Sequence, residues 1–521
     1  MNKRTSILCV LALLLLSAVL NYAIHYNYPL PTHSDEYDHL AIIQEMDNTG
    51  KHVWYDPYIV QQRHAQRNLE INYDVFLYVF YALTGLELRY LPMLLPIIFS
   101  FLLSVSAFVL VHFLTRRDLA AFFAGIFVLF LSSNIAFLGY WFMVPMAVGI
   151  AAVPLLAFAF LRSFHSWAYA FLLYLFLIAL TLTHAVYTVS LLPAFLLFLL
   201  LSPRETLRPP NLLKLLLGTA ILLGLTTFFV QWNLGNFLET LFLIAYMMVW
   251  PYGKHTVEYP LNEYLGSLMW LLALAGLLYL ALPAFNRRFP AFFERFRVLQ
   301  STRKTVHHQK LLILLPLVLL AVRVYADYSG VCLLGPCRRT MPGLAVILLM
   351  LAAIGFYSFI AFLNKLLVGV AERPYRILRV AIFLLVLAFL FHQLATDPFR
   401  YASDEAKGLY HNIEVEEQPA LAWLKDYTEP STVIFALPWT AKAVYLLAER
   451  KVVDTGAARL GSGLASLKDI VNFFLVDCVG KEAALARYPA DFIYAGKGYV
   501  DCRNLDLIAN HGGYFTYVPN H

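Results

Sequence analysis

The sequence predicts a polytopic α-helical membrane protein with about eleven transmembrane helices and a small C-terminal α/β domain outside the cytoplasm. Two features of the composition support this class: 60% of the 521 residues are hydrophobic, and only 14% are charged. So little charge cannot cover the surface of a soluble globule of this size. The net charge of +6 is best explained by basic residues retained in cytoplasmic loops, so no nucleic-acid partner is expected.

The transmembrane prediction depends on apolar segments that are long enough to cross about 30 Å of hydrocarbon. The first follows Lys3 and Arg4, and no small-residue cleavage site comes after it, so we expect a retained helix and not a signal peptide. The predicted spans are residues 6–24, 91–114, 119–138, 147–162, 167–183, 186–201, 211–230, 264–283, 310–326, 342–363 and 378–395. The apolar stretch from Tyr73 to Thr84 is shorter and is predicted to be an interfacial or re-entrant helix.

The basic residues of the short loops determine the predicted orientation. With the amino terminus in the cytoplasm, the loops on that side hold most of the arginines, with the largest group between residues 286 and 309. The regions then expected outside are the first loop (25–90), residues 231–263, and everything after about residue 396. We therefore predict a transmembrane domain of residues 1–395 and an extracytoplasmic α/β domain of residues 396–521. The predicted location is the plasma membrane.

The composition of the sequence changes after residue 396, where charged residues become more frequent and apolar runs become shorter. Strands are predicted at residues 432–436, 451–454, 491–494 and 514–518, with a helix at 441–449. Outside the cytoplasm disulfides can persist, and we predict two of them, Cys332–Cys337 and Cys478–Cys502. The spacing of these cysteines is poor for zinc. Cys9, in the first helix, is expected to be a small buried apolar side chain.

The most unusual segment follows the first predicted span and reads His33-Ser34-Asp35-Glu36-Tyr37-Asp38-His39. On a helix that begins near Ser34, Asp35 shares a face with Asp38 and His39, whereas Glu36 is turned about 100° away. A carboxylate at a membrane surface can act as a general base. The residues alone leave two other interpretations open. One is a helix cap or solvated loop, because Thr32 and Asp35 fit the capping pattern, and the other is a divalent-metal site.

The order of these segments resembles the GT-C superfamily of membrane glycosyltransferases, which use sugars carried on polyprenyl phosphate or diphosphate. Within it the chain looks most like the protein O-mannosyltransferase and lipid A aminoarabinose transferase branch. The matching stretches are Ser34 to Leu40, Tyr73 to Gly85, Leu91 to Leu114 closed by Arg116-Arg117, and Arg339-Thr340-Met341-Pro342. The resemblance implies that Asp35 is the catalytic base and Glu36 its neighbour.

The sequence departs from the family pattern in two places. The loop of residues 139–146 lacks the acid found there in several relatives, and Glu70-Ile71-Asn72-Tyr73-Asp74 replaces a Lys-Pro-Pro or His-Pro-Pro signature. Donor type and metal dependence are therefore open, and if a divalent cation (Mg²⁺ or Mn²⁺) is bound, Asp35 and His39 are its candidate ligands. The C-terminal region also lacks a Trp-Trp-Asp sequence, which argues against transfer of a whole oligosaccharide to asparagine.

The function implied by the resemblance is that of an inverting glycosyltransferase. It moves a sugar from a polyprenyl (dolichyl) phosphate donor to a hydroxyl of a glycan, lipid or protein acceptor on the outer membrane face. Polar and cationic side chains are needed to bind the donor and its phosphate, and the candidates are Asp38, His39, His184, Lys254, Arg323, Arg338 and Arg339. The aromatic run from Tyr246 to Tyr252 fits either sugar stacking or an interfacial belt.

Two alternatives to an enzyme are kept open. A transporter or flippase of lipid-linked or small polar substrates is expected to place ionisable residues within its spans and to show an internal repeat. The predicted spans hold hardly any charge. A non-catalytic scaffold that displays the C-terminal domain is the other alternative, and it predicts that Asp35 lies far from any lipid-width groove.

Overall fold

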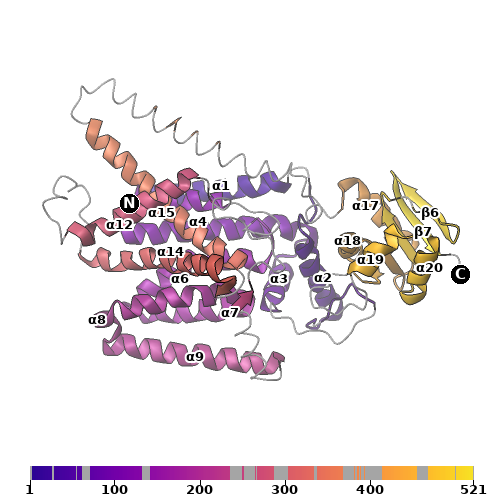
Figure 1. Cartoon of the computed structure of the whole chain (residues 1–521), viewed down its shortest axis with the longest axis horizontal. Helices are drawn as coiled ribbons and strands as arrows, with labels where there is room; N and C mark the ends of the chain where they lie inside the picture. Colours follow the sequence, from indigo (N-terminus) through magenta and orange to yellow (C-terminus); the bar gives the residue numbers. More distant parts are fainter. Residues whose placement is uncertain are drawn as a thin grey trace. The chain divides into compact units, whose positions relative to one another are not determined.

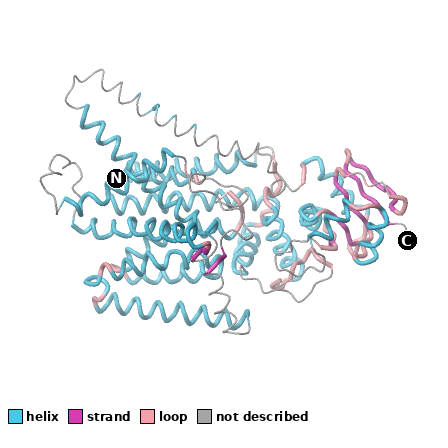
Figure 2. Tube along the Cα trace, in the orientation of Figure 1, coloured by secondary structure: helices cyan, strands magenta, loops and turns pink. Residues whose placement is uncertain are grey.

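Helices make up most of the computed structural model, and the larger β-sheet lies near the C-terminus (Figure 2). The structure describes residues 3–25, 28–53, 55–60, 71–131, 141–234, 249–251, 265, 267–286, 303–333, 337–367, 381, 384–385, 388, 392, 413–454, 467–498, 500 and 502–519. The chain divides into two compact units. The first unit contains Met1–Ile24, Leu95–Trp141 and Pro145–Ser403, and the second contains His25–Leu94, Phe142–Val144 and Asp404–His521.

The first unit is a bundle of long apolar helices that lie side by side (Figure 1). Its elements are α1 (Lys3–His25), α4 (Leu91–Thr115), α5 (Asp118–Phe127), η2 (Val128–Phe130), α6 (Pro145–Ser163), α7 (Trp167–Leu200), α8 (Pro203–Thr206), α9 (Pro209–Leu234), α12 (Ser267–Asn286), α14 (Arg303–Ser329) and α15 (Cys337–Leu367). A short antiparallel ladder joins β1 (Val249–Pro251) to β2 (Val331–Leu333).

The tightest helix contact in the bundle depends on two glycines. A Cβ added at Gly276 of α12 would lie 1.9 Å from the carbonyl oxygen of Leu351, and one added at Gly355 of α15 would lie 1.9 Å from that of Leu272. Only glycine leaves room for the two backbones at this distance. Small residues at such crossings are typical of helices packed in a membrane, where close van der Waals contact drives association.

The polytopic helical class predicted from the sequence is confirmed. Within the described residues, 6 helices are long and apolar enough to cross a membrane: Arg4–Ala23, Leu88–Thr115, Pro145–Ser163, Trp167–Leu200, His308–Ser329 and Arg339–Leu363. The shorter apolar helices are Asp118–Phe130, Pro209–Leu225 and Ser267–Ala281. The count of about eleven spans stays a prediction, and the predicted span 378–395 lies mostly outside the described residues. The two spans predicted on either side of residue 185 form one helix, α7, which is kinked where His184 leaves helical geometry (φ −157, ψ 82).

The second unit combines the predicted first loop with the C-terminal region. Its elements are α2 (Ser34–Thr49), α3 (Ile71–Thr84), η1 (Leu88–Tyr90), η4 (Val415–Glu417), α17 (Gln418–Tyr427), β3 (Val433–Ala436), α18 (Pro438–Ala448), β4 (Lys451–Val452), α19 (Leu467–Leu475), α20 (Cys478–Arg487), β5 (Phe492–Gly496), β6 (Leu505–His511) and β7 (Tyr514–Pro519). The strand order is β4-β3-β5-β7-β6. Strand β3 is parallel to β4 and β5, and β7 is antiparallel to β5 and β6.

Alternation along the central strands gives this sheet two apolar faces. Ile434 and Ala436 belong to a core with α17 and α18, whereas Phe435 belongs to a core with α19 and α20. Figure 1 shows these helices beside the strands. The first of these cores also takes in Tyr28, Leu30, Tyr37, Tyr58 and Ile59 of the first loop.

Hydrogen bonds join the first loop to the C-terminal region, and two of them are backbone bonds to β4. The Tyr28 hydroxyl donates to the Ile413 carbonyl at 2.7 Å, and the Val452 amide donates to the Tyr58 carbonyl at 2.8 Å. The Val60 amide donates in turn to the Val452 carbonyl at 3.1 Å. The predicted boundary near residue 396 marks a change of composition, whereas the compact unit takes in segments from both sides of that boundary.

The short helix α3 buries one side and exposes large apolar side chains on the other, and its interfacial or re-entrant position stays a prediction. Tyr73 and Leu77 are buried, whereas Phe76, Val79 and Leu83 are 44%, 46% and 82% exposed. Large apolar side chains with this exposure fit a helix that lies against lipid on one side and protein on the other.

A disulfide joins Cys478 at the start of α20 to Cys502 in the loop before β6. Cys332 is also disulfide-bonded, and the side chain of Cys337, its predicted partner, lies outside the described residues. Cys9 is a free, partly exposed thiol, so the expectation that it is buried is wrong: it lies on a side of α1 where neighbouring leucines are exposed too.

Removing the Cys478–Cys502 disulfide is expected to destabilise the C-terminal sheet. The bond closes a segment with a sequence separation of 24, for which loop-closure entropy corresponds to about 3 kcal/mol. The C478S/C502S variant should therefore unfold at a lower temperature than the wild type, as measured by thermal unfolding in detergent. Cys9→Ser is the control and should leave the transition unchanged. Equal transitions for all three proteins would contradict this prediction.

Candidate functional site

The acidic cluster predicted from the sequence forms the first turns of α2. His33 is the N-cap residue in extended geometry (φ −130, ψ 148), and its ring Nδ1 accepts a hydrogen bond from the Asp35 amide at 3.1 Å. An acceptor Nδ1 must be unprotonated, which requires the neutral ring. Burial lowers the pKa of His33, the charge of Asp35 raises it, and the charge of Lys442 lowers it again.

Glu36 completes a capping box with His33. Its Oε2 accepts hydrogen bonds from the amides of Thr32 (2.7 Å) and His33 (3.0 Å) and from the Thr32 hydroxyl (3.3 Å). Its Oε1 accepts one from the Met143 amide at 2.7 Å. The capping pair predicted from the sequence, Thr32 and Asp35, is therefore wrong: the pair in the structure, His33 and Glu36, lies one residue later in the chain. The sequence pattern did not identify this pair because histidine is an unusual N-cap residue.

Glu36 is fully buried, and burial raises its pKa to about 7 from an ordinary value near 4.5, although the hydrogen bonds from Met143, His33 and Thr32 lower it. A raised folded-state pKa means that the folded protein binds this proton more strongly than the unfolded chain. The resulting stabilisation is fully present below about pH 4.5 and is lost as the pH rises through 7.

Protonation of Glu36 should be detectable in how the free energy of unfolding changes with pH. Relative to Glu36→Gln, the unfolding free energy of the wild type is expected to fall by about 3 kcal/mol as the pH rises from about 4.5 to above 7. Parallel thermal unfolding of the two proteins across this range measures the difference. A difference that is constant with pH would show that Glu36 keeps an ordinary pKa.

Asp35 lies next to Glu36 in the sequence but in a different environment. Its side chain is 47% exposed, and its Oδ2 lies 3.8 Å from His33 Nδ1. The acidic pair is thus divided into one buried carboxylate, which accepts backbone hydrogen bonds, and one accessible carboxylate at the amino end of a helix. The positive end of the helix dipole favours the ionised form of a carboxylate at this position.

Asp38 and His39 are buried one turn later on α2. Asp38 Oδ2 lies 2.6 Å from the Lys442 ammonium of α18, with both side chains almost fully buried. His39 Nδ1 lies 2.6 Å from Asp74 Oδ1 of α3, and its ring meets the Tyr73 ring edge-on at 4.7 Å. Both residues therefore attach α2 to neighbouring helices, and their predicted role in donor binding stays a prediction.

The other predicted donor-binding residues belong to the first unit. His184, at the kink of α7, is 5% exposed, with its ring 5.4 Å from that of Tyr187. Arg323 is 4% exposed, and its guanidinium Nη2 lies 3.2 Å from Asp327 Oδ1. Arg339 is exposed in the first turn of α15. Lys254 and the side chain of Arg338 lie outside the described residues.

A metal site at Asp35 and His39 stays a prediction. In the described part of the chain, no group of three or more His, Cys, Asp and Glu side chains is arranged to hold a metal ion. Nδ1 of His39 is bonded to Asp74. An ion at Asp35 would therefore need further ligands from the substrate or from residues outside the described ranges.

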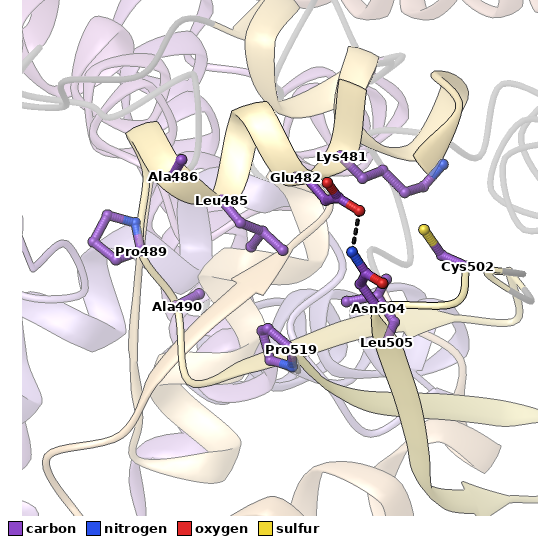
Figure 3. A pocket seen from close by; sticks show the side chains of 10 residues that line it. All are labelled: Lys481, Glu482, Leu485, Ala486, Pro489, Ala490, Cys502, Asn504, Leu505 and Pro519. Carbon is purple, nitrogen blue, oxygen red and sulfur yellow. Dashed lines mark hydrogen bonds between the residues drawn. The ribbon is translucent and has the colours of Figure 1, made fainter. Parts of the chain in front are cut away.

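A cavity of about 300 Å³ lies in the C-terminal sheet region, between α20 and the ends of β6 and β7 (Figure 3). Leu485, Pro489, Leu505 and Pro519 form much of its apolar lining. The polar groups at its rim are bonded to protein: Asn504 donates to Glu482, and the Lys481 ammonium donates to the Val476 carbonyl. Among the described residues, none of the predicted catalytic or donor-binding side chains lines this cavity.

Sequence reasoning missed three partners of the acidic cluster: Met143, Asp74 and Lys442. Met143 contributes only a backbone amide, which no side-chain pattern reveals. Asp74 is a single acidic residue in the apolar stretch predicted to be an interfacial or re-entrant helix, and this position could have marked it as a residue with a buried partner. Lys442 lies 404 residues from its partner, so no local pattern connects the two.

Comparison with solved structures relates this fold to GT-C membrane glycosyltransferases. The oligosaccharyltransferase of Archaeoglobus fulgidus, tethered with an acceptor peptide, superposes with a TM-score of 0.57 at 13% identity, over 94% of this chain and 69% of that one. The oligosaccharyltransferase AglB from Archaeoglobus fulgidus, in complex with an inhibitory peptide and a dolichol-phosphate, gives 0.53 at 13% identity over the same shares. ArnT from Cupriavidus metallidurans, bound to undecaprenyl phosphate, gives 0.54 at 12% identity, over 99% of this chain and 98% of that one.

These likenesses confirm, at the level of the fold, the GT-C resemblance predicted from the sequence. No protein-family model matches the chain, and no curated protein sequence matches it. At identities this low the likeness concerns the fold, and the assignment of a reaction depends on the site itself.

Proposed function

We propose that this chain is a glycosyltransferase that takes a sugar, a hexose or a pentose, from a polyprenyl-phosphate donor and transfers it to a hydroxyl acceptor. The observation that carries the proposal is the accessible carboxylate of Asp35 in the first turn of a capped helix, directly after the first long apolar helix. The fold supports the donor class, because the related structures of AglB and ArnT contain dolichol-phosphate and undecaprenyl phosphate.

In this proposal Asp35 is the general base. Its carboxylate accepts the proton of the acceptor hydroxyl while that oxygen attacks the anomeric carbon of the donor. The bond from the anomeric carbon to the phosphate oxygen breaks, polyprenyl phosphate leaves with the electron pair, and the configuration inverts. A phosphate is a good leaving group, so the site needs a base and cationic groups for the phosphate more than a strong acid. His184, Lys254, Arg323, Arg338 and Arg339 are the candidates for binding the donor.

Glu36 acts differently in this proposal. Its two oxygens accept four hydrogen bonds in a fully buried setting, so it holds the start of α2 against the Phe142–Val144 segment. We assign it the positioning of Asp35, and Asp35 the proton transfer. The excess of basic residues in alternate loops supports a site on the extracytoplasmic face.

Transfer in reconstituted vesicles tests the proposed function. The purified chain in proteoliposomes, given radiolabelled hexosyl- and pentosyl-phosphate polyprenols and hydroxyl acceptors, is expected to release polyprenyl phosphate and to form a glycoside of inverted configuration, which NMR can identify. Movement of the intact lipid-linked sugar across the bilayer, without cleavage of the sugar–phosphate bond, would support the flippase alternative instead.

A further inference from the structure

A buried ion pair, Asp38 with Lys442, links the first loop to the C-terminal region. The ammonium and carboxylate lie 2.6 Å apart, and the side chains are 3% and 2% exposed for Lys442 and Asp38. Moving two charges out of water is costly, and the attraction between them offsets that cost only in good geometry. Such a pair adds little to overall stability, whereas removing one partner is strongly destabilising, and here its short contact connects α2 to α18.

The pair lies close to Asp35 along the helix. Asp38 follows Asp35 by three residues, so the two side chains occupy the same side of α2 on successive turns. Lys442 also acts on the cap, because its charge contributes to lowering the pKa of His33, after burial and in opposition to Asp35. A neutral His33 is the state in which Nδ1 accepts the Asp35 amide.

A second contact holds the same two helices together farther along. The Tyr445 hydroxyl, three residues after Lys442 on α18, donates to Glu45 Oε2 at 2.8 Å, and Glu45 Oε1 accepts from the Tyr55 hydroxyl at 2.7 Å. Tyr445 is itself part of the apolar core that the first loop shares with the sheet. Two contacts between α2 and α18, about two turns apart on α2 and about one turn apart on α18, restrict both sliding and rotation of α2.

From this arrangement we infer that Lys442 of the C-terminal region is a positioning residue for Asp35, acting through Asp38 and the N-cap of α2. The inference depends on the proposed function, in which Asp35 is the base. If Lys442 positions Asp35, the C-terminal region affects the rate of the transfer step, and this effect is separate from any role of the region in binding the acceptor.

The experiment compares three variants with the wild type. Lys442→Met leaves the Asp38 charge buried without the ammonium that lies 2.6 Å from it. The D38N/K442M variant removes both charges, so it avoids that penalty while still lacking the contact. Lys425→Met is the matched control, because the Lys425–Glu449 pair has the same 2.6 Å separation but is about half exposed, where ion pairs have little effect.

Two readings are taken from each protein. Amide hydrogen exchange of residues 34–40, without substrate, is expected to be at least about ten-fold faster in K442M and in D38N/K442M. In the transfer assay, kcat is expected to fall at least about ten-fold, with KM for the lipid-linked sugar within about two-fold. The melting temperature should drop in K442M and recover in D38N/K442M, whereas K425M should match the wild type throughout.

The outcomes separate this inference from the proposed function. Recovery of both the melting temperature and kcat in D38N/K442M, with wild-type exchange, would show that the ion pair is only structural and would overturn the inference. A wild-type protein that transfers no sugar from any donor, or an active Asp35→Asn variant, would overturn the proposed function. The exchange measurement would then still report whether Lys442 orders the start of α2.

Discussion

Replacing Asp35 by asparagine is expected to lower kcat by about 10²–10⁴-fold, the usual contribution of a general base. Asparagine has nearly the same shape but cannot accept a proton at neutral pH. Because the Asp35 side chain is 47% exposed, the substitution should leave the melting temperature and the yield of folded protein unchanged. The measurement is transfer of radiolabelled sugar from a polyprenyl-phosphate donor in proteoliposomes.

Asp47→Asn is the matched control, because Asp47 is an exposed aspartate in the last turn of the same helix. It should keep kcat within about two-fold of the wild type, as expected for a surface residue away from the site. Turnover of Asp35→Asn at a similar level would show that another group removes the proton, and the assignment of Asp35 as base would have to be abandoned.

Truncating Glu36 to alanine is expected to cost stability on the order of 4 kcal/mol, since several buried donors lose their acceptor at once. The amides of Thr32, His33 and Met143 would be left without this carboxylate. Glu36→Gln keeps one acceptor oxygen and should cost less. Thermal unfolding of the two variants measures the difference, and equal melting temperatures would show that the capping box contributes little.

The transfer activity of a Glu36 variant is expected to depend on whether Asp35 is still held in place. In the proposed division of roles, Glu36→Gln retains measurable transfer because Asp35 is still present, whereas Asp35→Asn does not. A Glu36→Gln protein that is stable but as inactive as Asp35→Asn would mean that the buried carboxylate takes part in the chemistry directly.

Features of the chain that depend on local patterns could be predicted from the sequence. Apolar runs identified most of the long helices, and β-branched runs located β3, β5 and β7, because hydrophobic periodicity reflects burial directly. Strand β6 was missed, since Leu505–His511 has the burial pattern of a largely exposed edge, with Asp506 and Asn510 among its residues. The two spans predicted as residues 167–183 and 186–201 are instead one kinked helix, α7, because the apolar run is interrupted at His184 without the helix ending there.

The sequence predicted the position of the candidate site but not the environment of each acidic side chain in it. The acidic segment and its helix could be recognised, but which acid is buried depends on partners from elsewhere in the chain. The buried carboxylate of Glu36 accepts a hydrogen bond from the Met143 amide, and that of Asp38 accepts one from Lys442. Contacts over such sequence separations leave no local periodicity, so the different environments of Asp35 and Glu36 emerge only from the fold.

The core shared by the first loop and the C-terminal sheet has a consequence for biosynthesis. Tyr28 and Ile413 are 385 residues apart, so the ribosome makes the loop long before the strands and helices that complete its core. At usual rates of synthesis, about 5–20 residues per second, the loop waits for tens of seconds with Tyr37 and Tyr58 lacking their final neighbours. Helix α2 can therefore reach its final packing only after almost the whole chain has been made, and chains that stop early should be recognised by quality-control proteases.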